Sequence, residues 1–156
     1  MKIRWKPLII CLVIPLAVGG LSALLTRDGM EAFQRLNQPP LSPPGWLFPV
    51  VWTILFLLMG IASYLVFTSK ESRDAVNTAL LVYGIQLVVN FFWSIFFFNF
   101  GAYLFSFFWL ILLWVLILAV LLLFGRISKA AGYLMLPYLL WVSFAGYLNL
   151  AIYLIN

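Results

Sequence analysis

The side chains that could do chemistry in the apolar parts of this chain are aromatic rings and uncharged amides. One group of five stands alternately three and four residues apart: Tyr83, Gln86, Asn90, Trp93 and Phe97. That spacing places them along a single helix face. Two further stripes have the same character, namely Tyr138, Trp141, Ala145 and Asn149, and Pro49, Trp52, Phe56 and Ser63. Together, flat rings and a few polar groups suit a large, flat, mostly apolar ligand.

Two interpretations of these polar residues remain open at this point. Asn90 and Asn149 are typical of interhelical hydrogen bonds within a membrane, and equally of ligand contacts. Trp109 and Trp114 lie on the fourth apolar stretch, which contains no amide side chain. We expect those two tryptophans to pack against lipid or neighbouring helices.

Several residue types are missing where catalysis would need them. The chain has no histidine, and no Asp, Glu, Lys or Arg lies within its long apolar stretches. Proton relays, haem axial ligation, metal centres and catalytic triads all depend on such groups, so we expect no metal and no cofactor. Cys11 is the single cysteine and is expected to be a small buried hydrophobe.

Helices that cross a membrane are what must position these stripes. Of the 156 residues, 66% are hydrophobic and 8% charged. Five apolar stretches are each long enough to span a hydrocarbon core of about 30 Å, at roughly 7–25, 46–67, 78–98, 101–124 and 131–154. The sequence therefore predicts an all-α integral membrane protein, with residues 1–156 forming a single domain and a single bundle of five transmembrane helices.

The distribution of basic residues predicts the orientation of the bundle. Five spans put the N-terminus on the same side as the 68–77 and 125–130 connections, and that side holds seven of the nine basic residues. Only Arg27 and Arg35 lie on the other side. The positive-inside rule then predicts a cytoplasmic N-terminus, with the 26–45 loop and the C-terminus opposite. A cleaved signal peptide at the first span is the less favoured alternative, and the net charge of +5 follows from topology rather than from a nucleic-acid surface.

Prolines crowd the entry to the second span, in "LNQPPLSPPGWLFPVVW" at 36–52. Ser42 is expected to cap the helix, with Pro43 and Pro44 in its first positions. Pro49 and Pro137 are expected to bend their helices by removing a backbone donor. We expect the prolines to hold open a pocket in the bundle.

The residues that carry these patterns resemble the tryptophan-rich sensory protein/translocator protein family, also called the peripheral benzodiazepine receptor family. The resemblance covers essentially the whole chain. It rests on "PP" at 43–44 with Trp46, "VW" at 51–52, "MG" at 59–60, "YLVF" at 64–67, "QLVVNFFWSIFF" at 86–97 and "LPYLLWVSFAGYLNLAIY" at 136–153.

The resemblance implies a five-helix bundle, usually a homodimer, that binds porphyrins such as protoporphyrin IX and isoquinoline or benzodiazepine drugs beneath the loop after the first span. Carried onto this sequence, the implied ligand-binding positions are Trp46, Trp52, Asn90, Trp93, Trp141, Phe144, Ala145 and Leu148. The implied partners are a flat apolar small molecule and the lipid bilayer. The loop departs from the family pattern at Ala32, Phe33, Gln38 and Leu41, which puts the strength or identity of ligand binding in question.

Two functions compete on these grounds. In the first, the protein is a receptor or carrier for a porphyrin, with Arg27 and Arg35 at the pocket rim to hold the propionates. In the second, the resemblance to members that degrade protoporphyrin in light makes Trp52 and Trp141 the catalytic candidates. A secondary transporter unrelated to porphyrin is disfavoured, because the spans carry no charged residue.

Overall fold

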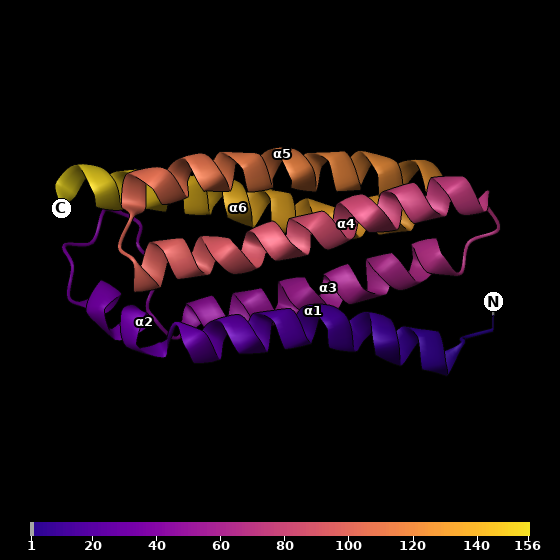
Figure 1. The fold of residues 1–156 in the computed structure, drawn as a ribbon, viewed down its shortest axis with the longest axis horizontal. Coiled ribbons are helices and arrows are strands. Elements are labelled where there is room, and N and C mark those ends of the chain that lie inside the picture. The colour runs from indigo at the N-terminus through magenta and orange to yellow at the C-terminus, as the bar shows by residue number, and fades with distance from the viewer. Residues whose placement is uncertain (1) are drawn as a thin grey trace.

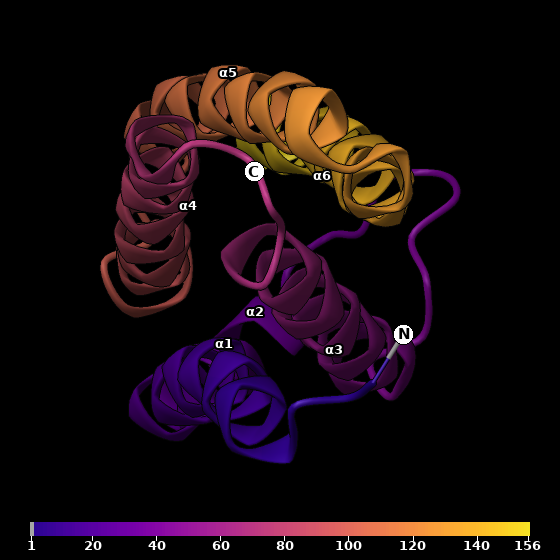
Figure 2. The ribbon, with the colours of Figure 1, turned by 90° about the vertical axis from the view of Figure 1, so that its right-hand side faces the viewer.

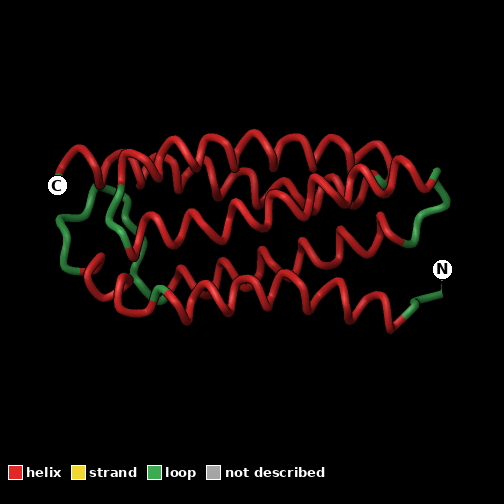
Figure 3. The backbone as a smooth tube through the Cα atoms, viewed as in Figure 1, coloured by secondary structure: helices red, strands yellow, loops and turns green. Residues whose placement is uncertain are grey.

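A computed structural model describes residues 2–156 and contains no β-strand within them. Five long helices run roughly antiparallel (Figures 1 and 3). They are α1 (Trp5–Leu25), α3 (Leu47–Phe67), α4 (Arg73–Ser94), α5 (Tyr103–Ile127) and α6 (Lys129–Ile155). Each is long and apolar enough to cross a membrane, with α4 counted together with the π-helical turn η1 (Ile95–Asn99) that continues it. The predicted all-α membrane fold with five spans is confirmed.

The helix ends extend beyond the apolar stretches where charged residues belong to the helix. α4 begins at Arg73, five residues before the predicted span, because Ser72 caps it: the Ser72 hydroxyl accepts the Ala75 N–H at 3.2 Å. α6 begins at Lys129 in the same way, capped by Ser128. These side-chain caps satisfy backbone donors that the first helical turn leaves free.

A short sixth helix, α2 (Arg27–Gln34), lies in the connection expected to be a loop. It covers one end of the bundle, at the opposite end from the N-terminus (Figure 1). An eight-residue segment is too short for an isolated helix to be stable in water, so packing against the bundle must support it.

The predicted capping of the second span by Ser42, Pro43 and Pro44 is wrong. α3 begins at Leu47, after Pro43 and Pro44, and the Ser42 hydroxyl donates to the Pro39 carbonyl at 2.7 Å instead of capping α3. Pro49 is the third residue of α3, where its missing N–H removes no bond from the helix interior. Pro137 does lie inside α6, on an exposed face and outside the pocket lining within residues 2–156.

Seen along its axis, the bundle has α1 beside α3, α5 beside α6, and α4 flanking α5 (Figure 2). Large, completely buried side chains lie mainly in the half nearer the N-terminus, among them Met59, Ile117, Phe124 and Met135. The opposite half, beneath α2, contains a pocket. The end of the bundle nearer the N-terminus is thus filled by packed side chains, and the end beneath α2 contains a cavity.

Candidate functional site

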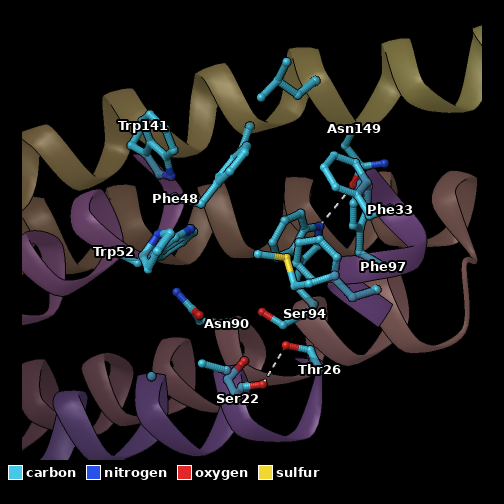
Figure 4. Close-up of a pocket in the computed structure, with 18 of the residues that line it drawn as sticks. Ser22, Thr26, Phe33, Phe48, Trp52, Asn90, Ser94, Phe97, Trp141 and Asn149 are labelled. Carbon is cyan, nitrogen blue, oxygen red and sulfur yellow. Dashed lines mark hydrogen bonds between the residues drawn. The ribbon is translucent and has the colours of Figure 1, made fainter. Parts of the chain in front are cut away.

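The pocket has a volume of about 320 Å³ and opens within the α2 end of the bundle. Four long helices and α2 contribute to its walls, and aromatic rings make up much of the lining. Figure 4 shows Trp52, Phe48 and Trp141 on one side, with Asn90, Ser94, Ser22 and Thr26 on the other. The site therefore has an aromatic wall facing a wall of small polar groups.

The three stripes predicted from the sequence meet at this pocket. Of the eight predicted ligand-binding residues, six lie in its lining: Trp52, Asn90, Trp93, Trp141, Ala145 and Leu148. Trp46 and Phe144 are not in the lining formed by residues 2–156. Trp46 is 67% exposed at the start of α3, and the Phe144 ring packs behind Trp141 at 5.5 Å.

The two predicted rim cations have different positions. Arg27, the first residue of α2, lines the pocket. Arg35 follows the end of α2, is exposed, and lies outside the lining described for residues 2–156. Arg27 is therefore the one of the two that is in position to meet a ligand's negative charge.

A hydrogen-bonded cluster forms the floor of the pocket and joins α4 to α6. The Asn90 Nδ2 donates to the Tyr138 hydroxyl at 2.6 Å, and that hydroxyl donates to Gln86 Oε1 at 2.7 Å. Tyr138 also meets the ring of Trp52 edge-on, with 6.1 Å between ring centroids. Since all these polar groups are buried and paired, the floor holds its shape without a ligand.

A second cluster fixes the far wall. The Trp93 indole N–H donates to Asn149 Oδ1 at 3.0 Å, and Asn149 Nδ2 donates to the Tyr103 carbonyl at 2.7 Å. Both amides left open by the sequence are thus interhelical hydrogen-bonding groups, and both also line the pocket. The two interpretations are compatible rather than exclusive.

The tryptophans differ in how their indole N–H groups are used. Trp109 donates to the Val89 carbonyl at 2.8 Å and Trp114 to the Ser143 hydroxyl at 2.9 Å, so both pack against neighbouring helices, as expected. Within residues 2–156 the indole N–H groups of Trp52 and Trp141 have no protein acceptor. Those two donors are available at the pocket wall.

The lid of the pocket consists of α2 and its junction with η1. Phe33 places its ring 5.4 Å from that of Phe97 and 5.5 Å from that of Phe98. Gly29 allows the close approach: a Cβ at that position would lie 2.6 Å from the Phe98 carbonyl carbon. Phe97 and Phe98 are consecutive residues of the π-helical turn η1, and both line the pocket.

Sequence reasoning missed the contribution of α1 and α2 to the lining. The missed residues include Ser22, Thr26, Met30 and Phe33. A signal for the first two was present, because two hydroxyl residues four apart at the end of an apolar span share a helix face. The Thr26 hydroxyl donates to the Ser22 carbonyl at 2.8 Å, which leaves the Ser22 hydroxyl at the pocket.

Comparison with known proteins gives one family over most of the chain. Residues 11–154 match the TspO/MBR family. The tryptophan-rich protein TspO of Chlorobaculum tepidum is 40% identical over 150 residues, covering 96% of this chain and 95% of that protein. The translocator protein of Bos taurus is 31% identical, covering 93% of this chain and 87% of that protein, and the tryptophan-rich sensory protein of Cereibacter sphaeroides is 32% identical, covering 81% and 77%.

Proposed function

The chain belongs to the TspO/MBR family, and from this membership and the pocket we propose that it is a membrane receptor or carrier for a porphyrin, with protoporphyrin IX as the expected ligand. The same pocket would take flat drug-like ligands of the isoquinoline and benzodiazepine type. The observation that carries the proposal is the aromatic wall formed by Trp52, Trp141 and Phe48 with two free indole donors.

The chemistry of a tetrapyrrole matches this wall. It offers two π faces, and by analogy with base stacking each well-placed ring contributes about 1–3 kcal/mol. The volume of about 320 Å³ is within the usual range for small-molecule pockets. A largely apolar lining with few polar groups favours such a ligand over a sugar or a nucleotide.

The propionates of a porphyrin need a cation at the edge of the pocket. Arg27 supplies one, since it lines the pocket at the start of the lid. A guanidinium pairs bidentately with a carboxylate, which fixes the orientation of the ring as well as its affinity. We therefore propose Arg27, and not Arg35, as the residue that pairs with a propionate.

A second candidate function is light-dependent degradation of the porphyrin. It is favoured by the positions of Trp52 and Trp141, whose electron-rich indoles lie at the pocket with unused N–H groups. In this reaction the excited porphyrin reacts with molecular oxygen, which adds across a methine carbon–carbon bond. The bond breaks, each carbon keeps one oxygen atom as a carbonyl, and no further reductant is consumed. Trp52 and Trp141 are then the catalytic residues.

Orientation and assembly belong to the same proposal. We expect the N-terminus on the cytoplasmic side, because the seven basic residues of that side gather at one end of the bundle. We also expect a homodimer, on the grounds of the family resemblance alone.

The test follows the absorbance of protoporphyrin IX with the purified protein, in darkness and under illumination. Wild type is compared with Trp52→Phe/Trp141→Phe and with the control Trp5→Phe/Trp46→Phe, which removes two exposed tryptophans outside the pocket lining described. Binding in darkness that weakens about tenfold or more only in the first variant supports the pocket.

The illuminated arm separates the two functions. Loss of the porphyrin bands in wild type, abolished in Trp52→Phe/Trp141→Phe although porphyrin remains bound, indicates photochemical degradation. Stable bands with retained binding indicate a receptor or carrier. No saturable binding, or equal loss in both double variants, contradicts a porphyrin site at these tryptophans.

A further inference from the structure

A groove separate from the pocket lies between the end of α5 and the start of α6, at the N-terminal end of the bundle. Its volume is about 420 Å³. Leu121, Leu122 and Leu136 supply apolar walls, and Leu122 is 55% exposed. It lies on the outer surface of the bundle, since Leu122, Tyr133 and Leu136 are all exposed.

Two glycines bring the helix backbones together at the base of this groove. A Cβ on Gly132 would lie 2.8 Å from the Gly125 Cα and 3.3 Å from the Leu121 carbonyl oxygen, so no side chain fits between the helices there. Without those side chains the surface is recessed between its flanking leucines. The groove is therefore a consequence of the tight α5–α6 crossing.

Two cations stand at the polar end of the groove. Arg126 is in the last turn of α5 and Lys129 is the first residue of α6, and both are exposed. Within residues 2–156 neither has a carboxylate at salt-bridge distance. Arg73, at the same end of the bundle, differs because it donates to the Phe67 carbonyl and lies 5.6 Å over the Phe67 ring. The N-terminus of α6 adds positive potential beside Lys129.

The length of the groove matches the headgroup and the first part of the acyl chains of a phospholipid. From Lys129 to Leu136 there are seven residues of helix, or about 10 Å along its axis at ~1.5 Å per residue. Tyr133 lies between them on the groove and is 73% exposed, the position in which a phenol at a membrane interface has its ring in lipid and its hydroxyl near the headgroups.

We propose that this groove binds one anionic phospholipid. The phosphodiester is held by Arg126 and Lys129, and an acyl chain lies against Leu122 and Leu136. Charge complementarity selects an anionic headgroup, since the groove presents two unpaired cations and no carboxylate in its lining. The apolar walls select a lipid over a free phosphate. This site is independent of the porphyrin pocket.

The test is a native mass spectrometry titration of the detergent-purified full chain with dioleoylphosphatidylglycerol and, separately, dioleoylphosphatidylcholine, which has the same acyl chains. We expect the anionic lipid to bind more tightly to wild type. Arg126→Gln/Lys129→Gln should weaken it roughly 30-fold. The same variant should weaken the zwitterionic lipid much less, because its choline cation offsets the phosphodiester charge. Lys70→Gln/Arg73→Gln removes the same charge at the same end and should have little effect.

A second pair of variants tests the groove by changing side-chain size instead of charge. Leu136→Trp fills the groove and should lower binding of the anionic lipid, whereas Leu140→Trp, on a lipid-facing position outside the groove lining described, should not. Equal effects within either pair of variants overturn the proposal. It is also overturned if glycerol phosphate displaces the lipid at equal concentration, which indicates a small-anion site, or if the groove variants abolish self-association instead, which indicates a contact between copies.

Discussion

At the scale of single residues, hydrogen bonding separates the tryptophans into two groups. Trp93, Trp109 and Trp114 donate their indole N–H groups to protein acceptors, so a change at these positions removes a structural bond as well as a ring. Trp52 and Trp141 have no such bond within residues 2–156 and line the pocket. Substituting those two therefore alters the site with the smallest disturbance of the fold.

Arg27 allows a prediction about charge. Arg27→Gln should weaken protoporphyrin IX binding by about 10- to 100-fold, because it removes a charge-assisted contact worth roughly 1.5–3 kcal/mol. A neutral isoquinoline ligand should be nearly unaffected. Equilibrium titration of both ligands measures the difference, and Arg35→Gln is the control of equal charge. Parallel loss of both ligands in Arg27→Gln, or equal loss of porphyrin in the two variants, would contradict a propionate contact at Arg27.

The sequence predicted many of the residues that line the pocket, but it did not predict their hydrogen-bond partners or their positions relative to the lid. Helical spacing identified Trp52, Asn90 and Trp141 as sharing inward faces, because that spacing is a property of each helix alone. It could not show that Trp46 lies outside the pocket lining or that Arg27 and Arg35 differ, since both depend on where the lid packs. Asn90 and Asn149 needed the structure for the same reason: their partners come from other helices.

At the scale of elements, the lid depends on one close contact. α2 lies against η1 where Gly29 meets the Phe98 carbonyl, and Asn99 Nδ2 donates to the Leu25 carbonyl at 3.0 Å beside it. The connection that follows is also held to α6, because the Tyr147 hydroxyl donates to the Pro40 carbonyl at 2.6 Å. The lid is thus held by a close backbone contact and by side-chain hydrogen bonds to backbone carbonyls, in addition to the packing of Phe33.

Gly29→Ala tests this contact. The new methyl group collides with backbone, which cannot rotate away, and overpacking of this kind costs about 1–3 kcal/mol. We expect the lid to sit less closely on η1 and bound porphyrin to dissociate about tenfold faster. Stopped-flow displacement measures the rate. Gly20→Ala on α1 is the control, since a Cβ there meets nothing within 4 Å, and an unchanged rate in Gly29→Ala would exclude a closing function for the contact.

The elements that sequence reasoning found and missed differ in what stabilises them. The five spans were predictable because length and apolar composition alone require them in a bilayer. α2 was missed because its stability comes from packing: Met30 and Phe33 line the pocket while the remainder of the helix is polar. The start of α3 was misplaced because three capping signals in a row, Ser42, Pro43 and Pro44, belong to the turn before it.

At the scale of the whole molecule, stability and binding lie in different halves of the bundle. Most of the completely buried side chains of α3, α5 and α6 lie towards the N-terminal end, and the pocket occupies the other. The Gln86–Tyr138–Asn90 cluster lies between them. Substitutions in the two halves should therefore have separable effects.

Ile117→Ala and Ser94→Leu make this separation measurable. Ile117 is completely buried, so its truncation should destabilise the fold by about 2–5 kcal/mol and leave the Kd of the folded protein unchanged. Ser94→Leu projects into the pocket and should weaken ligand binding about tenfold while changing Tm little. Thermal unfolding and ligand titration on both variants provide the comparison, and a change in both quantities for each variant would mean that the halves are coupled.

The placement of tryptophans also has an optical consequence. Trp52, Trp93 and Trp141 line the cavity, and the absorption of a porphyrin overlaps the emission of indole. A bound porphyrin would accept excitation energy from these three rings over distances of a few ångströms, so their fluorescence should fall as the site fills. The protein carries its own reporter of occupancy, and no dye need be attached to follow binding when the purified chain is placed in a lipid bilayer.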